Sequence, residues 1–129
     1  NAISCKSLNE KLYMIFSSLC SILDMYDVKE AAIEKVFVNS NPKSSMYLCY
    51  ARASTVISLM SKQIEIHEYS ATTIKKLVFG NGKASKEQVS FVVKHTFGMN
   101  SSLLSDHASD AIATALCHLY NRRSLLNYR

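Results

Sequence analysis

The chain is poor in the residues that mark fibrous, disordered or membrane-spanning proteins. One proline and three glycines among 129 residues argue against a collagen-like or disordered polymer. No apolar run reaches the roughly 18 residues that a membrane-spanning helix needs, and the first residues show no signal peptide. Apolar residues make up 48% and charged residues 19% of the chain. This composition and length predict one globular domain over residues 1–129.

The four cysteines lack the spacing of a zinc site or a redox motif. They stand at positions 5, 20, 49 and 117, and no two form a CxxC pair. Cys20, Cys49 and Cys117 fall within apolar helical patterns, where cysteine acts as a small hydrophobe. We therefore expect reduced thiols and a cytoplasmic location, with a disulfide framework as the minor alternative.

Basic residues outnumber acidic ones. Lys and Arg number 15 and Asp and Glu number 10, which gives a formal charge of +5. An excess of this size is a mild indication of a polyanionic partner, although many proteins reach it without one. Any carboxylate metal site must be drawn from a short set of acids, in which the aspartates are Asp24, Asp27, Asp106 and Asp110.

Hydrophobic periodicity predicts a succession of helices and strands. Apolar residues at three- and four-residue steps predict a helix over about 7–25, and a mostly apolar run predicts a buried strand over 31–38. A helix over about 43–61, a strand near 64–67, a short helix capped by Ser70 and a helix from Ser85 to about 96 follow. Ser105 or Asp106 begins a final helix, and the tail from 121 is expected to fray. The predicted buried stripe of that helix is Ala108, Ala111, Ile112, Ala115, Leu116 and Leu119.

The helix predicted over 43–61 is apolar on most of its sides. Such a helix is buried against more than one surface. Two interpretations are equally supported: it is a central helix of the core, or it packs against a second subunit.

Glu34 is unusual because it lies in the middle of the predicted apolar strand. An ionised carboxylate in such a place costs free energy unless it is paired or binds a metal. A purely structural explanation is equally supported. In that case the alternation of the strand turns Glu34 toward solvent at an edge, or Lys35 or another base pairs with it.

His107 and Asp110 lie three residues apart in the first turn of the final predicted helix. This spacing places both on one face, with Cβ atoms roughly 5–6 Å apart, so that they can bind one ion together. For the helix alone, the simpler interpretation is favoured, in which Asp106 caps the helix and Asp110 is a solvated charge. If the helix packs on the strand that carries Glu34, three potential ligands converge.

Residues 78–89 contain a glycine loop with lysines around it. Gly80 and Gly82 permit unusual backbone angles, and exposed amides beside flexible cations suit phosphate contacts. The pattern is neither a P-loop nor a dinucleotide fingerprint, so a solvated basic loop is the simpler interpretation. The surrounding cations are Lys75, Lys76, Lys83 and Lys86.

Phe37 closes the predicted strand immediately before a polar turn. It is either a core residue or an aromatic that stacks on an unpaired nucleic-acid base, an interaction worth about 1–3 kcal/mol.

Together these segments resemble the RuvC-type Holliday-junction resolvases, over about residues 2–118. The segments read AAIEKVFVNSNPKSSMYLCYARA, IKKLVFGNGKASKEQV and DHASDAIATALCH. The usual family forms read like IEQVF followed by an asparagine turn, then QARG, VKxxVxGxGxAxKxQV and DAADALAIAxCH. All of them have counterparts here in the same order and at matching separations, which makes the resemblance specific.

This resemblance implies an α/β, RNase H-like fold with a mixed sheet flanked by helices. It also implies a homodimer that cuts two opposed strands of a four-way DNA junction, using Mg²⁺ or Mn²⁺. Glu34 then matches the glutamate at the end of the inner strand and Asp110 the last acid of the final helix, and both are expected catalytic metal ligands. His107 stands where the usual form has Asp, as it does in some members, and is expected to bind metal or transfer a proton. The expected DNA contacts are Phe37, Lys75, Lys83 and Lys86.

One family element has no counterpart in this sequence. The family begins with a strand carrying Gly-Ile-Asp-Pro-Gly, whose Asp is a metal ligand, and neither Asp24 nor Asp27 follows an apolar strand. We therefore expect the first hairpin of the sheet to be missing from this chain. Three functions stay open: a junction-resolving endonuclease impaired in this chain, a protein that binds branched DNA without cutting it, or an RNase H-like nuclease with another substrate. Branch-migration proteins are potential partners.

Overall fold

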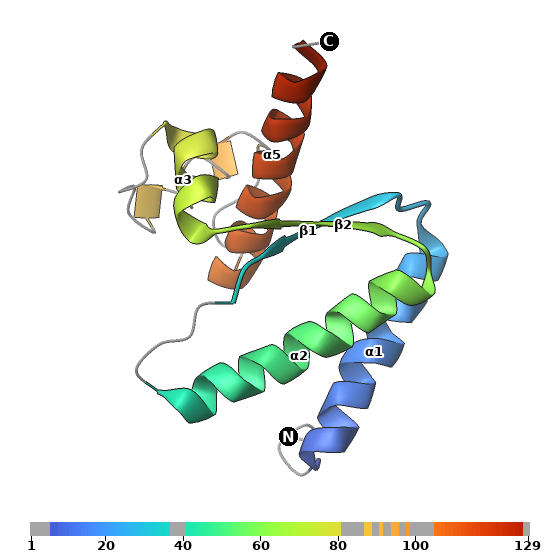
Figure 1. Ribbon diagram of the computed structural model, residues 1–129. Coiled ribbons are helices and arrows are strands. Elements are labelled where there is room, and N and C mark those ends of the chain that lie inside the picture. Colours follow the sequence, from blue (N-terminus) through green and yellow to red (C-terminus); the bar gives the residue numbers. More distant parts are fainter. Residues whose placement is uncertain are drawn as a thin grey trace. The chain divides into compact units, whose positions relative to one another are not determined.

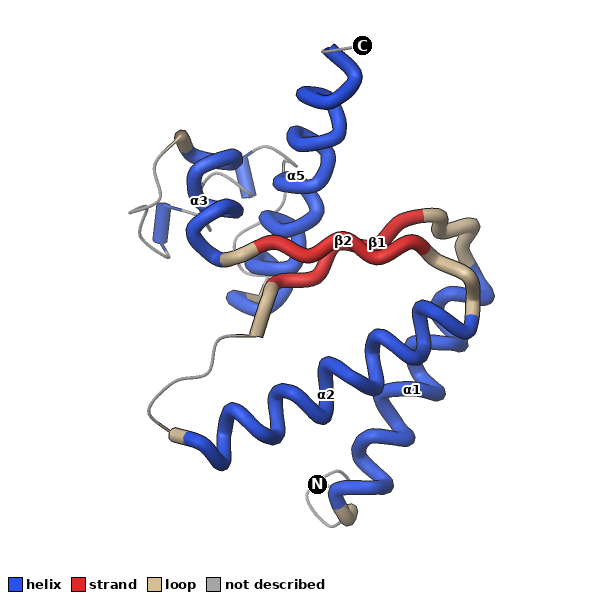
Figure 2. The backbone as a smooth tube through the Cα atoms, in the orientation of Figure 1, coloured by secondary structure: helices blue, strands red, loops and turns tan. Residues whose placement is uncertain are grey.

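The computed structural model describes residues 6–36, 41–80 and 105–127, together with positions 87, 88, 91, 94, 95 and 98. Figures 1 and 2 show its helices and strands. Within this described part, no helix is long and apolar enough to span a membrane. In chain order the elements are α1 (Leu8–Met25), β1 (Glu30–Glu34), α2 (Pro42–Ser61), β2 (Glu65–Tyr69), α3 (Ala71–Phe79) and α5 (Asp106–Asn127).

The chain divides into two compact units. The first comprises residues 1–31 and 36–66, and the second comprises residues 32–35 and 67–129. The candidate metal ligands Glu34, His107 and Asp110 all belong to the second unit. That residues 1–129 form a single domain stays a prediction.

Local signals in the sequence set the helix starts. Ser7 Oγ accepts a hydrogen bond from Glu10 N at 3.2 Å, while the Glu10 carboxylate accepts one from Ser7 N at 2.8 Å. This reciprocal capping box satisfies two amides that the helix leaves without partners. Asn41 caps α2, whose first residue is Pro42, a position where the missing proline N–H costs nothing. Ser70 caps α3, so the two long predicted helices and the predicted cap are confirmed.

In the first unit, α1 and α2 pack against each other. Ser54 Oγ of α2 donates a hydrogen bond to the Leu12 carbonyl of α1 at 2.7 Å. One turn further along, the buried Ser58 Oγ lies 3.5 Å from the Phe16 carbonyl. Since residues four apart share a helix face, these two small side chains let the helix backbones approach closely.

Most of the large apolar residues of α2 remain exposed. Only Ser45, Ser58 and Leu59 of this helix are buried. A central core helix would bury these apolar residues, so that interpretation of α2 is wrong. Packing against a second subunit remains as the alternative. The exposed residues are Met46, Tyr47, Leu48, Tyr50, Ile57 and Met60.

β1 and β2 form a two-stranded sheet. Glu65 N donates to the Lys29 carbonyl at 3.1 Å, and Lys35 N donates to the Tyr69 carbonyl at 2.9 Å. The bonded partners advance in the same direction along both strands, so the pairing is parallel.

The strand predicted over 31–38 is shorter in the structure. β1 ends at Glu34, and residues 37–38 lie outside the described residues. Glu34 is therefore the exposed last residue of the strand and not its middle. The other residues of β1 are half-buried rather than fully buried.

In the second unit, α3 and α5 pack together around a small core. A chain of hydrogen bonds also joins β2 to α5, because Asn121 Nδ2 donates to Tyr69 Oη at 3.3 Å and Tyr69 Oη lies 2.6 Å from His118 Nδ1. The phenol accepts from Asn121, so its own hydrogen is available to Nδ1. The buried core residues are Tyr69, Ile74, Ala113 and Cys117.

The buried face of α5 differs from the predicted stripe. Ala111, Ala115 and Leu119 belonged to that stripe but are exposed. The hydrophobic periodicity of the sequence predicted burial of the more apolar face of the helix. The face that is packed carries mainly small and polar residues, which allow the backbones to approach closely. The helix also continues to Asn127, so residues 121–127 are helical where fraying was expected. The buried residues are Ser109, Ala113, Thr114, Leu116, Cys117 and His118.

Candidate active site

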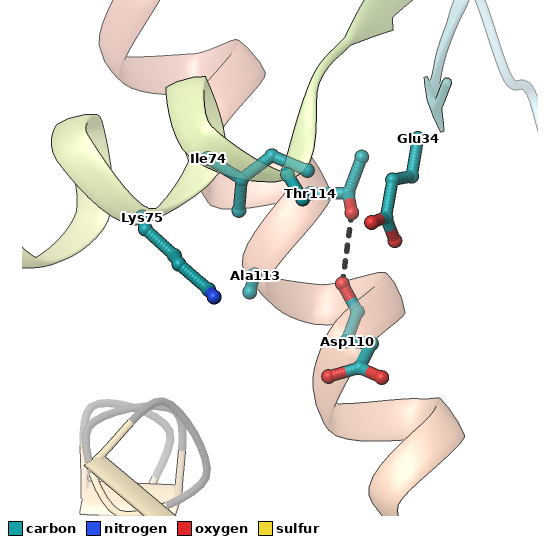
Figure 3. A pocket seen from close by; sticks show the side chains of 7 residues that line it. Glu34, Ile74, Lys75, Asp110, Ala113 and Thr114 are labelled. Carbon is teal, nitrogen blue, oxygen red and sulfur yellow. Dashed lines mark hydrogen bonds between the residues drawn. The ribbon is translucent and has the colours of Figure 1, made fainter. Parts of the chain in front are cut away.

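Two cavities of the second unit bring the predicted ligands together. One of about 240 Å³ is lined by residues of β1, α3 and α5, and one of about 380 Å³ by residues of β1 and α5. Glu34, Asp110 and Thr114 line both. Figure 3 shows the first cavity, with Glu34 reaching it from the strand end and Asp110 and Thr114 from the helix. The end of β1 and the start of α5 therefore face a common space.

Glu34 and Asp110 interact electrostatically. Partial burial has the largest effect and raises the pKa of Glu34, and the negative charge of Asp110 raises this pKa further. The Lys75 ammonium opposes both effects and lowers the pKa of Glu34. Two carboxylates that repel each other across one cavity suit a divalent cation, whose charge reverses the repulsion.

His107 is exposed in the first turn of α5 and lines the larger cavity with Glu34 and Asp110. The helix itself begins at a cap, since Ser105 Oγ accepts a hydrogen bond from Ala108 N at 3.1 Å. Three potential metal ligands thus share one space. Their carboxylate oxygens are the ligands that Mg²⁺ prefers, and an added imidazole is better tolerated by Mn²⁺.

Among the residues expected to contact DNA, Lys75 is the one that the structure describes. It is half-buried on α3 and lines the smaller cavity. Phe37, Lys83 and Lys86 lie outside the described residues. A cation thus lies beside the two carboxylates, as a site that approaches a phosphate requires.

Thr114 is a lining residue that the sequence pattern did not single out. It is 3% exposed, and its Oγ1 donates to the Asp110 backbone carbonyl at 2.8 Å (Figure 3). The signal was its position four residues after Asp110, because residues four apart share a helix face. A search for an apolar stripe passes over such a residue.

Comparison with known proteins identifies the family of this chain. Residues 2–118 match the family described as crossover junction endodeoxyribonuclease RuvC. The protein of that name from Anaplasma marginale (strain St. Maries) is 58% identical over 117 residues, which cover 90% of this chain and 71% of the relative. The protein from Anaplasma phagocytophilum (strain HZ) is 55% identical over 119 residues, which cover 92% of this chain and 73% of the relative.

Two solved structures share the fold. A Thermus thermophilus RuvC structure superimposes with a TM-score of 0.83, and T. thermophilus RuvC in complex with Holliday junction substrate superimposes with 0.86. Each is 21% identical, and the match covers 92% of this chain and 72% of that chain. The expected RNase H-like α/β class is confirmed. With the family match over residues 2–118 and these identities, the chain belongs to the RuvC family of crossover junction endodeoxyribonucleases.

Proposed function

We propose that this chain is an endodeoxyribonuclease that resolves four-way (Holliday) DNA junctions with a divalent metal ion. Membership of the RuvC family supports the nuclease activity, and the T. thermophilus relative was solved with a Holliday junction substrate. The observation that carries the proposal is the common cavity lined by Glu34, His107 and Asp110. Glu34 comes from β1, and His107 and Asp110 come from α5. Glu34 and Asp110 match the family motif, and His107 stands where its usual form has Asp.

Glu34 and Asp110 are the proposed metal ligands. Partial burial and the negative charge of Asp110 raise the pKa of Glu34 in the metal-free protein, so a cation held by both residues would favour the ionised form of Glu34. Bound Mg²⁺ or Mn²⁺ supplies activation of the attacking water and stabilisation of negative charge on the phosphate. His107 has two proposed roles, as a third ligand or as the group that transfers a proton.

The basic residues are proposed to hold the DNA. Lys75 lines the cavity beside the carboxylates, where an ammonium can contact the phosphate next to the scissile bond. Lys83 and Lys86 are proposed phosphate contacts, and Phe37 is proposed to stack on a base at the crossover. Four-way junction DNA is the proposed partner.

We further propose a homodimer that forms through the exposed apolar face of α2, which comprises Met46, Tyr50, Ile57 and Met60. Cytoplasmic location and cooperation with branch-migration proteins stay predictions.

The test uses synthetic four-way junctions and the full chain. With Mg²⁺ the parent protein is expected to cut two opposed strands symmetrically, at a reduced rate because no residue of this sequence matches the first Asp of the family. Glu34→Gln and Asp110→Asn are expected to lower cleavage by about 100-fold or more while junction binding persists, because a metal ligand is lost and the basic surface is kept. Asp27→Asn is the matched control, since the Asp27 carboxylate is largely exposed and pairs with Lys29 at 2.8 Å.

Each of the other outcomes has a definite meaning. Unchanged cleavage by both Glu34→Gln and Asp110→Asn contradicts the proposed ligands. Binding without cleavage by the parent, across a range of Mn²⁺ concentrations, indicates a branched-DNA-binding protein instead. Preference for linear duplexes or RNA–DNA hybrids in competition indicates a related nuclease with a different substrate.

A further inference from the structure

Thr114 is a polar residue in a buried position that lines the same cavities as Glu34 and Asp110. Its exposed fraction is 3%, and it lines both cavities together with Glu34 and Asp110. Figure 3 shows its hydroxyl on the side of α5 that faces Glu34. A buried hydroxyl at this place is therefore part of the lining of the site.

The hydrogen of the Thr114 hydroxyl is already committed. Oγ1 donates it to the Asp110 backbone carbonyl at 2.8 Å, so the oxygen can only accept hydrogen bonds from the cavity. The ionised carboxylates of Glu34 and Asp110 are acceptors as well. A cavity lined by three acceptors favours an occupant that donates hydrogen bonds. The water molecules that a hydrated divalent cation retains are such donors.

This chain departs from the family form DAADALAIAxCH at two positions that line the larger cavity. His107 stands in place of an Asp, and Thr114 stands in place of an Ile. The first change removes a carboxylate and the second adds a hydroxyl. The site therefore has fewer anionic ligands and one more group that can hold coordinated water.

We propose that Thr114 is a positioning residue whose hydroxyl would accept a hydrogen bond from a water of a hydrated divalent cation held by Glu34 and Asp110. The inference rests on the proposed function in one respect, that these two carboxylates bind the metal. The hydroxyl is well suited to this role because its bond to the Asp110 carbonyl fixes it to the turn that carries one of the ligands. Hydrogen bonds from outside the coordination shell typically change metal affinity or activity by about 10–100-fold.

The experiment measures Mn²⁺ binding to the full chain without DNA, by the paramagnetic resonance signal of free Mn²⁺. Thr114→Val keeps the side-chain shape and removes the hydroxyl, and we expect it to weaken Mn²⁺ binding about tenfold. Thr114→Ser keeps the hydroxyl and is expected to bind Mn²⁺ nearly as tightly as the parent.

Thr55→Val is the matched control. Thr55 Oγ1 makes the same type of bond, to the carbonyl of Ala51 four residues earlier at 3.1 Å, and Thr55 lines neither cavity. It is expected to bind Mn²⁺ like the parent. Circular dichroism checks that Thr114→Val is folded. If it is not, the Mn²⁺ affinities of Thr114→Ser and Thr114→Ala, which differ only by the hydroxyl, are compared instead.

Equal Mn²⁺ affinity of Thr114→Val and the parent overturns the inference, and so does an equal loss of affinity in Thr55→Val. Junction cleavage, scored separately, distinguishes this failure from failure of the proposed function. A parent that binds Mn²⁺ and loses affinity in Thr114→Val, but does not cut junctions, refutes the nuclease proposal alone. A parent that cuts junctions, with a Thr114→Val variant of unchanged affinity, refutes this inference alone. A parent that binds no Mn²⁺ refutes both.

Discussion

Individual charged residues determine what the candidate site can bind. Burial and the neighbouring Asp110 both disfavour the ionised form of Glu34, whereas Lys75 favours it. A carboxylate held under such opposing influences in a cavity is a typical feature of a functional site. Glu34 also remains exposed at the end of β1, so that an ion from solvent can reach it.

Substitution of Asp110 or Lys75 is expected to shift the pKa of Glu34 in the direction set by the charge that is removed. Asp110→Asn removes a negative charge and lowers this pKa, whereas Lys75→Met removes a positive charge and raises it. The measurement is a pH titration of the Glu side-chain carboxyl resonances in metal-free protein. An unchanged titration in Asp110→Asn would show that the two carboxylates are not coupled.

The same raised pKa fixes the sign of the effect on stability. Because the pKa of Glu34 is higher in the folded than in the unfolded chain, this residue lowers stability as pH rises from the unfolded to the folded pKa. Glu34→Gln is therefore expected to stabilise the metal-free protein slightly at pH 7, by less than about 1 kcal/mol once solvent screening is considered. Chemical denaturation at pH 7 and at acidic pH, where the difference should vanish, measures it.

At the level of the elements, hydrogen bonds between β2 and α5 help to hold the helix that carries Asp110. Tyr69 Oη lies 2.6 Å from His118 Nδ1 and accepts from Asn121 at 3.3 Å. Both Tyr69 and His118 are buried, so that polar atoms left there without partners cost free energy.

Tyr69→Phe removes this phenol and is expected to lower the free energy of unfolding by about 1–3 kcal/mol. Tyr13→Phe is the control, because Tyr13 is 69% exposed and its substitution should leave stability almost unchanged. Both are measured by guanidinium chloride denaturation. A loss in Tyr69→Phe no larger than that in Tyr13→Phe would mean that the hydrogen bonds contribute little.

Helix starts were predictable because their causes are local, whereas buried faces were not. Ser7 and Glu10 satisfy each other within four residues, and Ser70 caps α3 in a similarly short range. The face that α5 buries depends on its neighbours, and these accept Thr114 while Leu119 stays outside. An apolar stripe predicts the buried face of a helix when burial of large apolar side chains determines the packing. It does not predict that face when the helix packs through small residues that let the backbones approach closely.

At the level of the whole molecule, the exposed apolar face of α2 predicts self-association. Ile57→Glu places a charge where the side chain is 59% exposed in the monomer, and it is expected to convert a dimer into a monomer because a buried unpaired charge is costly. Light scattering at micromolar concentration measures the mass. Met25→Glu on α1, at a residue 72% exposed, is the control and should remain dimeric. A monomeric parent would contradict the proposed dimer.

The amino-acid sequence by itself determined the helix starts, the identity of the ligand-type residues and, through ordered motifs, the family. These are properties of short segments, whose hydrogen bonds and spacing lie within a few residues. Only the tertiary structure decided where β1 ends, which face of α5 is buried and that Glu34, Asp110 and Thr114 line the same cavities. Those outcomes depend on contacts between segments more than seventy residues apart in the case of Glu34 and Asp110, and no local pattern records such contacts.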